Sequence, residues 1–311
     1  MPQKTNTMNI YIIGAGAIGK ALAVCLKRKG SEVQLVRGSM DDGSTRYEEV
    51  VLSLEGEREL IENIKVSTLS SIPKMEGIIL LTNKSFGNQD LAKKLLHKAR
   101  QSPVILLQNG LGVERPFIQS GFTQLYRCVL FATAQTLSGH RVRYRPVSPS
   151  PIGTVRGETI PLDTLVEQVD SPLFRFSAVE NIEQIVWKKT MANCVFNSIC
   201  PLLEVDNGIF HRDSEVFAMA REIIAECIVI SRAKGIDFDA KDIEEQVLAI
   251  SKLSDGQFIS TLQDIQNNKE TEIETLNLEI LRIAQELGME AQVKNTKLLG
   301  ELIKSKSKLN R

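Results

Sequence analysis

Two different periods of hydrophobic and polar residues run along this chain. In the first half, short apolar runs predict buried strands, at residues 10–13, 32–36, 78–82, 104–107 and 126–134. In the second half, apolar residues recur at helical spacing and predict helices, at residues 187–197, 214–235, 239–252 and 271–288. The change of period near Ser177 predicts an α/β domain at residues 1–177 and an all-helical domain at residues 178–311.

Some stretches of the first half have weaker patterns. Residues 50–54 and 64–66 are further strand candidates, and residues 162–169 are a short helix candidate. The rest of the stretch 40–74 has no clear period. Residues 139–161 are rich in Arg, Pro, Ser and Gly, and they form either an antiparallel extension of the sheet or a loop.

A glycine-rich turn follows the first predicted strand and precedes a helix pattern over residues 20–29. A strand, G-x-G-x-x-G and a helix together are the context of the dinucleotide-binding fingerprint. The first glycine allows the tight turn, the second lets the backbone approach a pyrophosphate, and the third lets helix and strand pack closely. The sequence therefore predicts that a Rossmann-type domain binds a dinucleotide at the helix N-terminus. The motif is Gly14-Ala15-Gly16-Ala17-Ile18-Gly19.

Polar residues stand at the ends of three predicted strands. Arg37 ends the second strand, where NAD enzymes carry an acidic residue, and a guanidinium suits a 2′-phosphate. The sequence therefore favours NADP, the alternative being a solvated surface arginine. Lys84 and Asn109 follow two later strands, and in parallel sheets ligands bind at this edge. Either could instead be a loop charge or a turn former.

The predicted helix around Lys189 carries an unusual polar stripe. Lys189, Asn193 and Asn197 are spaced by four residues and share one face. The other residues are mostly apolar, which indicates a buried helix. Buried lysine and asparagine need partners, and a ligand with carboxylate and hydroxyl oxygens would supply them. A surface stripe, or amides that satisfy neighbouring backbone, is the other interpretation. Gly208 is a candidate C-terminal cap of this helix.

Composition narrows the function classes. The 311 residues suffice for two domains, and the 38 basic residues equal the 38 acidic ones, which gives no support to a nucleic-acid or membrane-surface role. No apolar run reaches the ~18 residues of a membrane span, and the polar start lacks a signal-peptide core. The expected location is the cytoplasm. The basic tail at residues 304–311 is expected to fray.

Cysteine and histidine usage limits the chemistry further. The five cysteines are scattered without a Cys-x-x-Cys pair, which predicts free buried thiols. The three histidines have no ligand partner at metal-binding spacing, so no metal site is expected. Acid–base chemistry should therefore rest on lysine or a carboxylate. The sequence is equally compatible with a monomer and a homodimer.

These motifs, together with two further segments near the end of the chain, resemble the ketopantoate reductase (2-dehydropantoate 2-reductase) family over almost the whole chain. The two segments alone are open to simpler interpretations, since Ser260 suits a helix N-cap and Glu272 an acidic residue in a first turn. The resemblance implies a Rossmann-type domain followed by an all-helical domain, as in 6-phosphogluconate dehydrogenase-like folds. The markers are the glycine motif, Lys84, Gln108-Asn109-Gly110, Trp187-x-Lys189-x-x-x-Asn193-x-x-x-Asn197, Asn207-Gly208, Ser260-x-Leu262-Gln263-Asp264 and Thr271-Glu272-Ile273.

The resemblance also implies the reaction, in which NADPH reduces 2-dehydropantoate to pantoate in pantothenate and coenzyme A biosynthesis. It implies that Lys189 is the general acid that protonates the carbonyl oxygen, and that Glu272 lies beside it and near the cofactor. The other implied cofactor contacts are Lys84, Asn109 and Ala134. The implied substrate contacts are Asn109, Lys189, Asn193, Asn197, Asn207 and Ser260.

Other functions remain open at this point. The same scaffold could reduce another branched 2-oxo acid or an imine, or it could oxidise a sugar acid in the opposite direction. A non-catalytic NADP-binding sensor is a different class, in which the helical domain would couple to a partner. Turnover of a 2-oxo acid would separate the enzyme from the sensor.

Overall fold

The protein forms two compact units. The structure is a computed structural model that describes residues 8–38, 41–157 and 159–311. By its internal contacts, the first unit runs to Gln108 and resumes over Val113–Ile182. The second unit contains Glu183–Arg311 together with the short segment Asn109–Gly112. The sequence predicts a boundary near Ser177, and the contacts divide the chain after Ile182.

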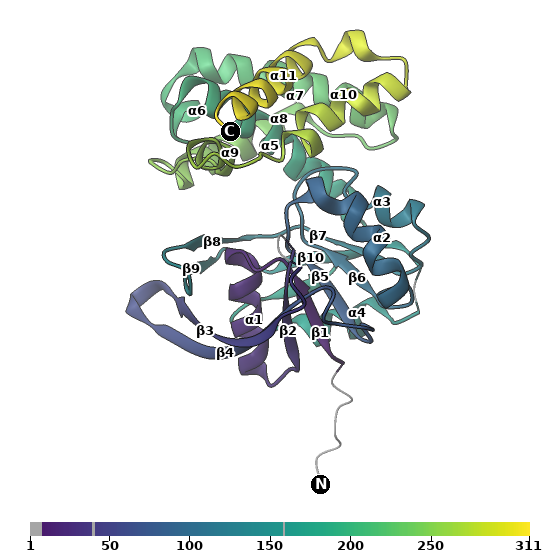
Figure 1. Ribbon diagram of the computed structural model, residues 1–311. Helices are drawn as coiled ribbons and strands as arrows, with labels where there is room; N and C mark the ends of the chain where they lie inside the picture. Colours follow the sequence, from purple (N-terminus) through teal and green to yellow (C-terminus); the bar gives the residue numbers. More distant parts are fainter. Residues whose placement is uncertain (1–7, 39–40, 158) are drawn as a thin grey trace. The chain divides into compact units, whose positions relative to one another are not determined.

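Within the described residues, the first unit holds an eleven-stranded sheet in the order β11-β10-β7-β6-β5-β1-β2-β4-β3-β9-β8 (Figure 1). The strands are β1 (Ile10–Ile13), β2 (Val33–Arg37), β3 (Thr45–Ser53), β4 (Glu59–Thr68), β5 (Ile78–Leu81), β6 (Val104–Leu106), β7 (Leu125–Cys128), β8 (Ala132–Thr136), β9 (Arg141–Pro146), β10 (Ser150–Arg156) and β11 (Phe176–Ala178). The helices are α1 (Ala17–Lys29), α2 (Asn88–Ala99), α3 (Arg115–Gln119) and α4 (Leu162–Val169), with 3-10 turns η1 (Glu55–Glu57) and η2 (Ser85–Gly87).

The centre of this sheet is parallel. β1 pairs in parallel with β2 and β5, β4 with β2, and β6 with β5 and β7. Every residue of β1 and β5 is buried, because helices cover both faces: α1 and α4 pack on one face, and α2 and α3 on the other. The carboxyl ends of β1, β2, β5 and β6 therefore meet at one edge, where ligands bind in sheets of this kind.

The sequence expectations for three stretches of this unit have different outcomes. Residues 126–134 do not form one strand: β7 ends at Cys128, and β8 begins at Ala132 in a different part of the sheet. Residues 139–161 do contribute an antiparallel extension, since β9 pairs antiparallel with β8 and β10 with β7. The strand candidates at residues 50–54 and 64–66 are confirmed in β3 and β4, which form an antiparallel pair that extends into residues without a clear period. Two residues of that stretch, 39 and 40, lie outside the described ranges.

The second unit is helical, and its described residues include no strand. This confirms the predicted fold class. Its elements are α5 (Ile182–Leu203), α6 (Ile209–Arg212), α7 (Ser214–Ala233), α8 (Ala240–Leu253), α9 (Ser260–Gln266), α10 (Asn277–Glu286) and α11 (Lys294–Leu309), with 3-10 turns η3 (Ile273–Thr275) and η4 (Glu290–Gln292). α5 is buried as predicted, since Trp187, Met191 and Val195 are each at most 2% exposed.

Three expectations in the helical unit were wrong. Gly208 does not cap the end of α5, which stops at Leu203; it precedes α6 with a right-handed φ of −69°. The stretch 271–288 is not one helix, because η3 ends before Leu276 and α10 begins after it. The tail does not fray at residue 304: α11 continues to Leu309, because Ile303 and Ser307 are buried.

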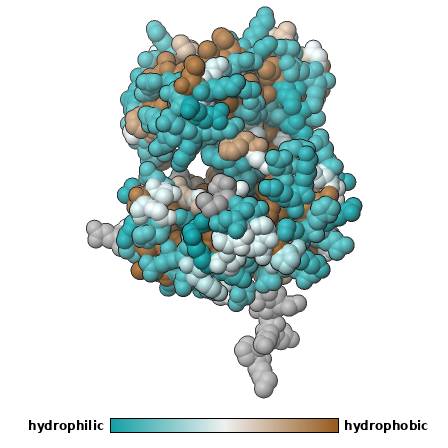
Figure 2. Space-filling view, in the orientation of Figure 1, coloured by the Kyte–Doolittle hydropathy of each residue, from teal (hydrophilic) through white to brown (hydrophobic). Residues whose placement is uncertain are grey.

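Figure 2 shows a face that is mostly hydrophilic, with hydrophobic residues gathered over parts of the helical unit. In the part of the chain that the structure describes, no helix combines the length and the apolar character that crossing a membrane requires. All five cysteines are free and buried, as predicted.

Candidate functional site

The glycine motif forms the turn from β1 into α1. Gly14 has a φ of +119°, and a Cβ there would crowd Thr82 and Asn83 at the end of β5. A Cβ on Gly19 would overlap the carbonyl oxygen of Gly14, so only glycine lets the helix approach the strand this closely. The Thr82 hydroxyl donates to that same carbonyl at 3.0 Å and holds the turn against β5.

The N-terminus of α1 is suited to an anion. Gly16 caps it without a side-chain hydrogen bond, and the first turn holds no acidic residue. A Cβ on Gly16 would meet no atom within 4 Å. The close packing at Gly14 and Gly19 and the open space at Gly16 match what a pyrophosphate on a helix N-terminus requires. The residues present therefore fit a dinucleotide.

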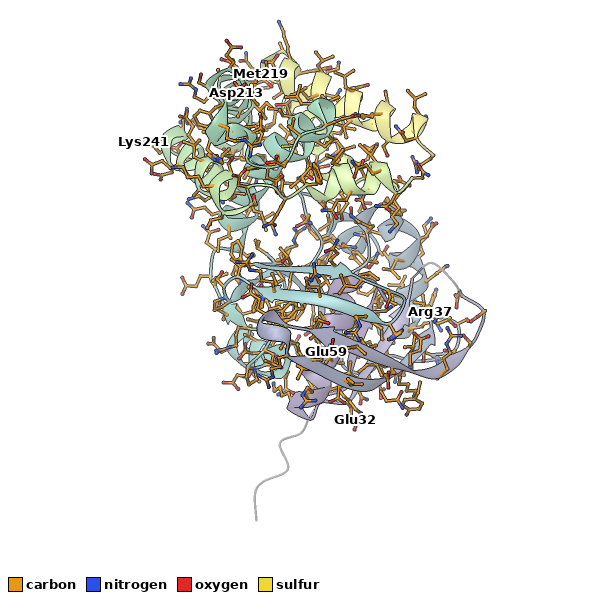
Figure 3. All side chains as sticks on the ribbon, turned by 90° about the vertical axis from the view of Figure 1, so that its left-hand side faces the viewer. Glu32, Arg37, Glu59, Asp213, Met219 and Lys241 are labelled. Carbon is orange, nitrogen blue, oxygen red and sulfur yellow. The ribbon has the colours of Figure 1, made fainter. Side chains whose placement is uncertain are left out.

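Arg37, the predicted reader of a 2′-phosphate, ends β2 and forms an ion pair with Glu48 of β3. Arg46 of β3 binds the same carboxylate oxygen, with 2.7 Å from Nε to Oε1. Arg37 and Glu48 are half-buried, with side chains 21% and 25% exposed. Figure 3 shows Arg37 on the sheet of the first unit. The cationic group is therefore present at the expected strand end, and it has an acidic partner that the sequence did not indicate.

The other predicted nucleotide contacts lie on different strands. Lys84 is partly buried and lies between β5 and η2, directly before η2. The amide of Gln108 anchors this edge, since it donates to Asn83 O at 2.9 Å and pairs with the Asn88 side chain at 2.8 Å. Ala134 lies in β8, at the far end of the strand order, but β8 contacts α1, so its position beside the glycine-motif helix is consistent with a cofactor role.

Asn109 belongs to the helical unit, although the strand before it belongs to the sheet. Thr275 of η3 holds the segment: its hydroxyl donates to Asn109 O at 3.2 Å, and its carbonyl accepts from Leu111 N at 2.8 Å. Thr275 also binds the carbonyl of Glu272, with 3.1 Å from its hydroxyl and 3.0 Å from its N–H. The structure thus brings Asn109 and Glu272, which are far apart in the sequence, to a common residue.

On α5, Lys189 and Asn193 are partly buried and Asn197 is 3% exposed. The Asn197 amide is engaged within the unit, because it donates to Asn193 O at 3.1 Å and accepts from the Thr261 hydroxyl at 2.7 Å. The hydroxyl of Ser260, itself exposed, lies 3.5 Å from the same oxygen. The start of α9 therefore lies against the polar face of α5. Thr261, a buried hydroxyl beside the predicted Ser260, was missed in the sequence.

Asn207 lies in the turn between α5 and α6 and is 6% exposed. Its backbone is held by two bonds: Ser251 Oγ donates to Asn207 O at 2.7 Å, and Asn207 N donates to Gln257 O at 2.9 Å. Its buried side-chain oxygen has no hydrogen-bond partner among the described residues. An amide kept in place in this way could receive a ligand donor.

Asp206 braces the Asn207 turn. Its carboxylate accepts from Gly208 N at 2.7 Å, from Gly256 N at 3.2 Å and from Arg212 at 2.8 Å. These bonds, the Arg212 hydrogen bond first, hold the pKa of Asp206 below its ordinary value. Asp206 and Arg212 carried no distinct sequence signal, because neither position is periodic or part of a motif.

A last bond ties the Glu272 segment to α5. Asn277, at the start of α10, is fully buried and donates to Cys194 O at 3.2 Å. Cys194 follows Asn193, so the bond joins two predicted segments of the site. Among the described residues, no group of three or more His, Cys, Asp or Glu side chains could hold a metal ion. The predicted site residues of this unit offer one lysine, several amides, one hydroxyl and one carboxylate.

Comparison with known proteins gives a consistent result. Residues 10–155 match the family described as ketopantoate reductase PanE/ApbA, and residues 181–307 match the description of its C-terminal domain. A 2-dehydropantoate 2-reductase of Pyrococcus horikoshii is 30% identical over 308 residues, which is 97% of this chain and 98% of that protein. The chain belongs to the ketopantoate reductase family. As a member of the ketopantoate reductase family, it is a nucleotide-dependent oxidoreductase.

Solved structures support the fold of this ketopantoate reductase family member. A family ketopantoate reductase from Ralstonia eutropha JMP134 has a TM-score of 0.81 at 24% identity, covering 97% of this chain and 99% of that one. A D-mandelate dehydrogenase, in a ternary structure with NADH and anilino(oxo)acetate, has a TM-score of 0.84 at 20% identity with the same coverage. At these identities the likeness supports the fold alone.

Proposed function

We propose that this chain reduces 2-dehydropantoate to pantoate with NADPH, in the synthesis of pantothenate and coenzyme A. The observation that carries the proposal is the polar face of α5: between Val186 and Cys200 every residue is buried except Lys188, Lys189 and Asn193, and the last two share one face. The name and full-length similarity of the Pyrococcus horikoshii relative support the same substrate. The oxygens of a bound 2-oxo acid would accept hydrogen bonds from a lysine and an amide at this spacing.

In the proposed mechanism, Lys189 is the general acid. Hydride addition to a 2-oxo acid leaves negative charge on the carbonyl oxygen, and a lysine with an ordinary pKa of ~10.4 is protonated at neutral pH and can donate to it. Glu272 stabilises the charged form of the lysine. Asn109, Asn193, Asn207 and Ser260 orient the oxygens of the substrate, and Asn197 shares that role through its ties to Ser260 and Thr261.

The bound nicotinamide would supply the hydride, and the protein binds and orients it. The glycine motif with the N-terminus of α1 would hold the pyrophosphate, and Arg37 the 2′-phosphate. Lys84, Asn109, Ala134 and Glu272 would line the rest of the cofactor site. The preference for NADPH is part of the proposal, because the D-mandelate dehydrogenase of the same fold was solved with NADH.

The direct test is oxidation of NADPH at 340 nm with 2-dehydropantoate, beside pyruvate and 2-oxoisovalerate. We expect turnover of 2-dehydropantoate well above both controls. Lys189→Ala should lower kcat by ~10²–10⁴, the usual range for the loss of an acid–base group. Lys188→Ala is the matched control, because the neighbouring lysine lies on a different face of α5, and it should leave kcat within about twofold.

Three outcomes would contradict parts of the proposal. An unchanged kcat in Lys189→Ala would remove this lysine from the mechanism. Tight NADPH binding without turnover of any 2-oxo acid would favour the sensor instead. For the cofactor, Arg37→Asp should weaken NADPH far more than NADH, and equal weakening would mean that Arg37 does not contact the 2′-phosphate.

A further inference from the structure

The Arg37 guanidinium already has an anion bound to it. Glu48 lies on β3, which is separated from β2 by β4, and its carboxylate reaches Arg37 from there. Arg46 binds the same carboxylate from the exposed side, with its own side chain 57% exposed. Glu48 thus bridges a half-buried arginine at the strand end and a solvent-facing arginine beside it.

A third cation lies near this pair. This cation is Lys20, in the first turn of α1. Burial lowers the pKa of Lys20, the charge of Glu48 opposes that effect, and the charge of Arg37 adds to it. The Lys20 ammonium also donates to the carbonyl oxygen of Gly139. The charge of Arg37 acts on Asp42 as well. Three cations (Arg37, Arg46 and Lys20) thus accompany two carboxylates (Glu48 and Asp42), and the excess positive charge beside the glycine motif suits an additional anion.

Glu48 is ionised at neutral pH in this setting. Burial opposes its ionisation, but hydrogen bonds and charge from Arg46 and Arg37 outweigh burial and hold the pKa of Glu48 below its ordinary value. Its negative charge is therefore present under the conditions in which a cofactor binds.

We propose that Glu48 is a built-in competitor for the 2′-phosphate at Arg37, and that Arg46 is the group that holds Glu48 when the phosphate displaces it. The proposal rests on the proposed NADPH function and names residues that set the cofactor preference. The 2′-phosphate must either take the place of the carboxylate on Arg37 or bind beside it, and two like charges on one guanidinium repel each other. NADH has no 2′-phosphate and does not disturb the Arg37–Glu48 pair.

Glu48→Gln and Arg46→Gln should therefore change the affinity for NADPH in opposite directions. Glu48→Gln removes the charge but keeps an oxygen that can accept from Arg37, so NADPH should bind roughly 3- to 10-fold more tightly while NADH changes less than about twofold. Arg46→Gln leaves Glu48 bound to Arg37 alone and should weaken NADPH roughly 2- to 5-fold.

The matched control is Glu59→Gln. Glu59 lies on β4 of the same sheet, pairs with Arg141 and is 40% exposed. Figure 3 shows that it lies well apart from Arg37. Glu59→Gln also removes one negative charge. If the net charge of the protein alone made NADPH bind more tightly, this variant would show the same gain in affinity. We expect none beyond about twofold.

The experiment is a fluorescence titration of the intact protein with NADPH and NADH, for wild type, the three single variants and Glu48→Gln/Arg46→Gln. If Arg46 acts through Glu48, it should lose its effect on NADPH in the double variant. If Arg46→Gln weakens NADPH equally in both backgrounds, Arg46 binds the phosphate itself and its proposed role is overturned. Unchanged NADPH affinity in Glu48→Gln overturns the competition.

A second readout covers a Glu48→Gln variant that fails to fold. Displacement titrations with 2′,5′-ADP and 5′-AMP compare the adenosine half of the cofactor with and without its 2′-phosphate. Arg46→Gln should weaken 2′,5′-ADP and leave 5′-AMP unchanged; equal effects on both overturn the proposal. If the wild type did not bind NADPH at all, the proposed function would be rejected. If it bound NADPH but the changes at Glu48 and Arg46 had no effect, only the competition would be rejected.

Discussion

The two units hold their candidate residues by different means. In the sheet unit, the glycine motif, Arg37 and Lys84 lie at strand ends or within a few residues of them, so the order of strand, turn and helix places them. In the helical unit, hydrogen bonds between distant segments place them: Thr275 to Asn109, Thr261 to Asn197 and Ser251 to Asn207. The comparison teaches that a nucleotide site can follow from local geometry, whereas a substrate site on helices depends on tertiary contacts.

The largest expected effect comes from breaking the tie at Asn109. Gly110 has a φ of +90°, and a Cβ there would overlap Thr275. Gly110→Ala adds strain and overlap, so it should lower the free energy of unfolding by roughly 2–4 kcal/mol. Gly30→Ala is the control, since its φ of +95° gives the same kind of strain but a Cβ would meet nothing within 4 Å. It should lower that free energy by only about 1–2 kcal/mol. Denaturant unfolding measures both, and equal losses would show that the crowding at Thr275 has no effect.

The local geometry of the glycine motif can be tested in the same way. In Gly19→Ala the new Cβ overlaps the carbonyl of Gly14, so the variant should lose about 1–3 kcal/mol of stability as well as NADPH affinity. In Gly16→Ala the new Cβ has open space, so the melting temperature should stay within a degree or two while NADPH binds about tenfold more weakly. Thermal unfolding with and without NADPH separates the two. A large loss of stability in Gly16→Ala would mean that this space is not kept for a ligand.

A smaller effect is expected at the start of α9. Thr261→Val removes the hydroxyl that donates to Asn197 and leaves a buried amide oxygen with a weaker partner, for a loss of about 1–2 kcal/mol. Because Asn197 then loses its fixed orientation, the KM for the 2-oxo acid should rise more than kcat falls. Ser260→Ala, at an exposed position, should raise KM with little change in stability. Steady-state kinetics and denaturant unfolding of both variants check this, and a stable Thr261→Val with unchanged KM would rule out Thr261 as a positioning residue.

The smallest effect depends on pH. Because the pKa of Asp206 is depressed in the folded chain, its contribution to stability is present above the unfolded pKa of ~3.9 and is lost as pH falls through the lower folded value. At pH 7, Asp206→Asn should therefore be less stable than wild type by about 1 kcal/mol. The difference should shrink as the pH falls below about 4, and urea unfolding across that range would show it. A difference that does not depend on pH would mean that the charge of Asp206 is not what matters.

Much of the sheet unit could be predicted from the sequence, and the same comparison explains why. Fully buried parallel strands are apolar throughout, so β1, β5 and β6 stood out as short runs. Where pairing is antiparallel and one face is exposed, the runs are less distinct. The strand Thr45–Ser53 begins with exposed polar residues, and the break between Cys128 and Ala132 left the apolar pattern intact. The sequence therefore predicted only the end of β3, from residue 50, and did not predict the break after Cys128.

Less of the candidate site in the helical unit could be predicted. The spacing of Lys189, Asn193 and Asn197 marks one face of α5, but spacing does not reveal which segment lies against that face. Thr261, Thr275 and Ser251 are ordinary hydroxyl residues in the sequence, and only the fold shows what they bind. The same holds for Glu48, whose position opposite Arg37 depends on the pairing of β3 with β4.

The segment Asn109–Gly112 also has a consequence for evolution and for engineering. The helical unit is not a contiguous length of polypeptide, because these four residues are supplied from within the sheet unit. A chimaera that joins two relatives after Ile182 would combine this segment from one parent with Thr275 from the other. Chimaeras of family members should therefore fold best when the parents agree at Asn109–Gly112 and at Thr275. Otherwise the segment Asn109–Gly112 should be transferred together with the helical unit.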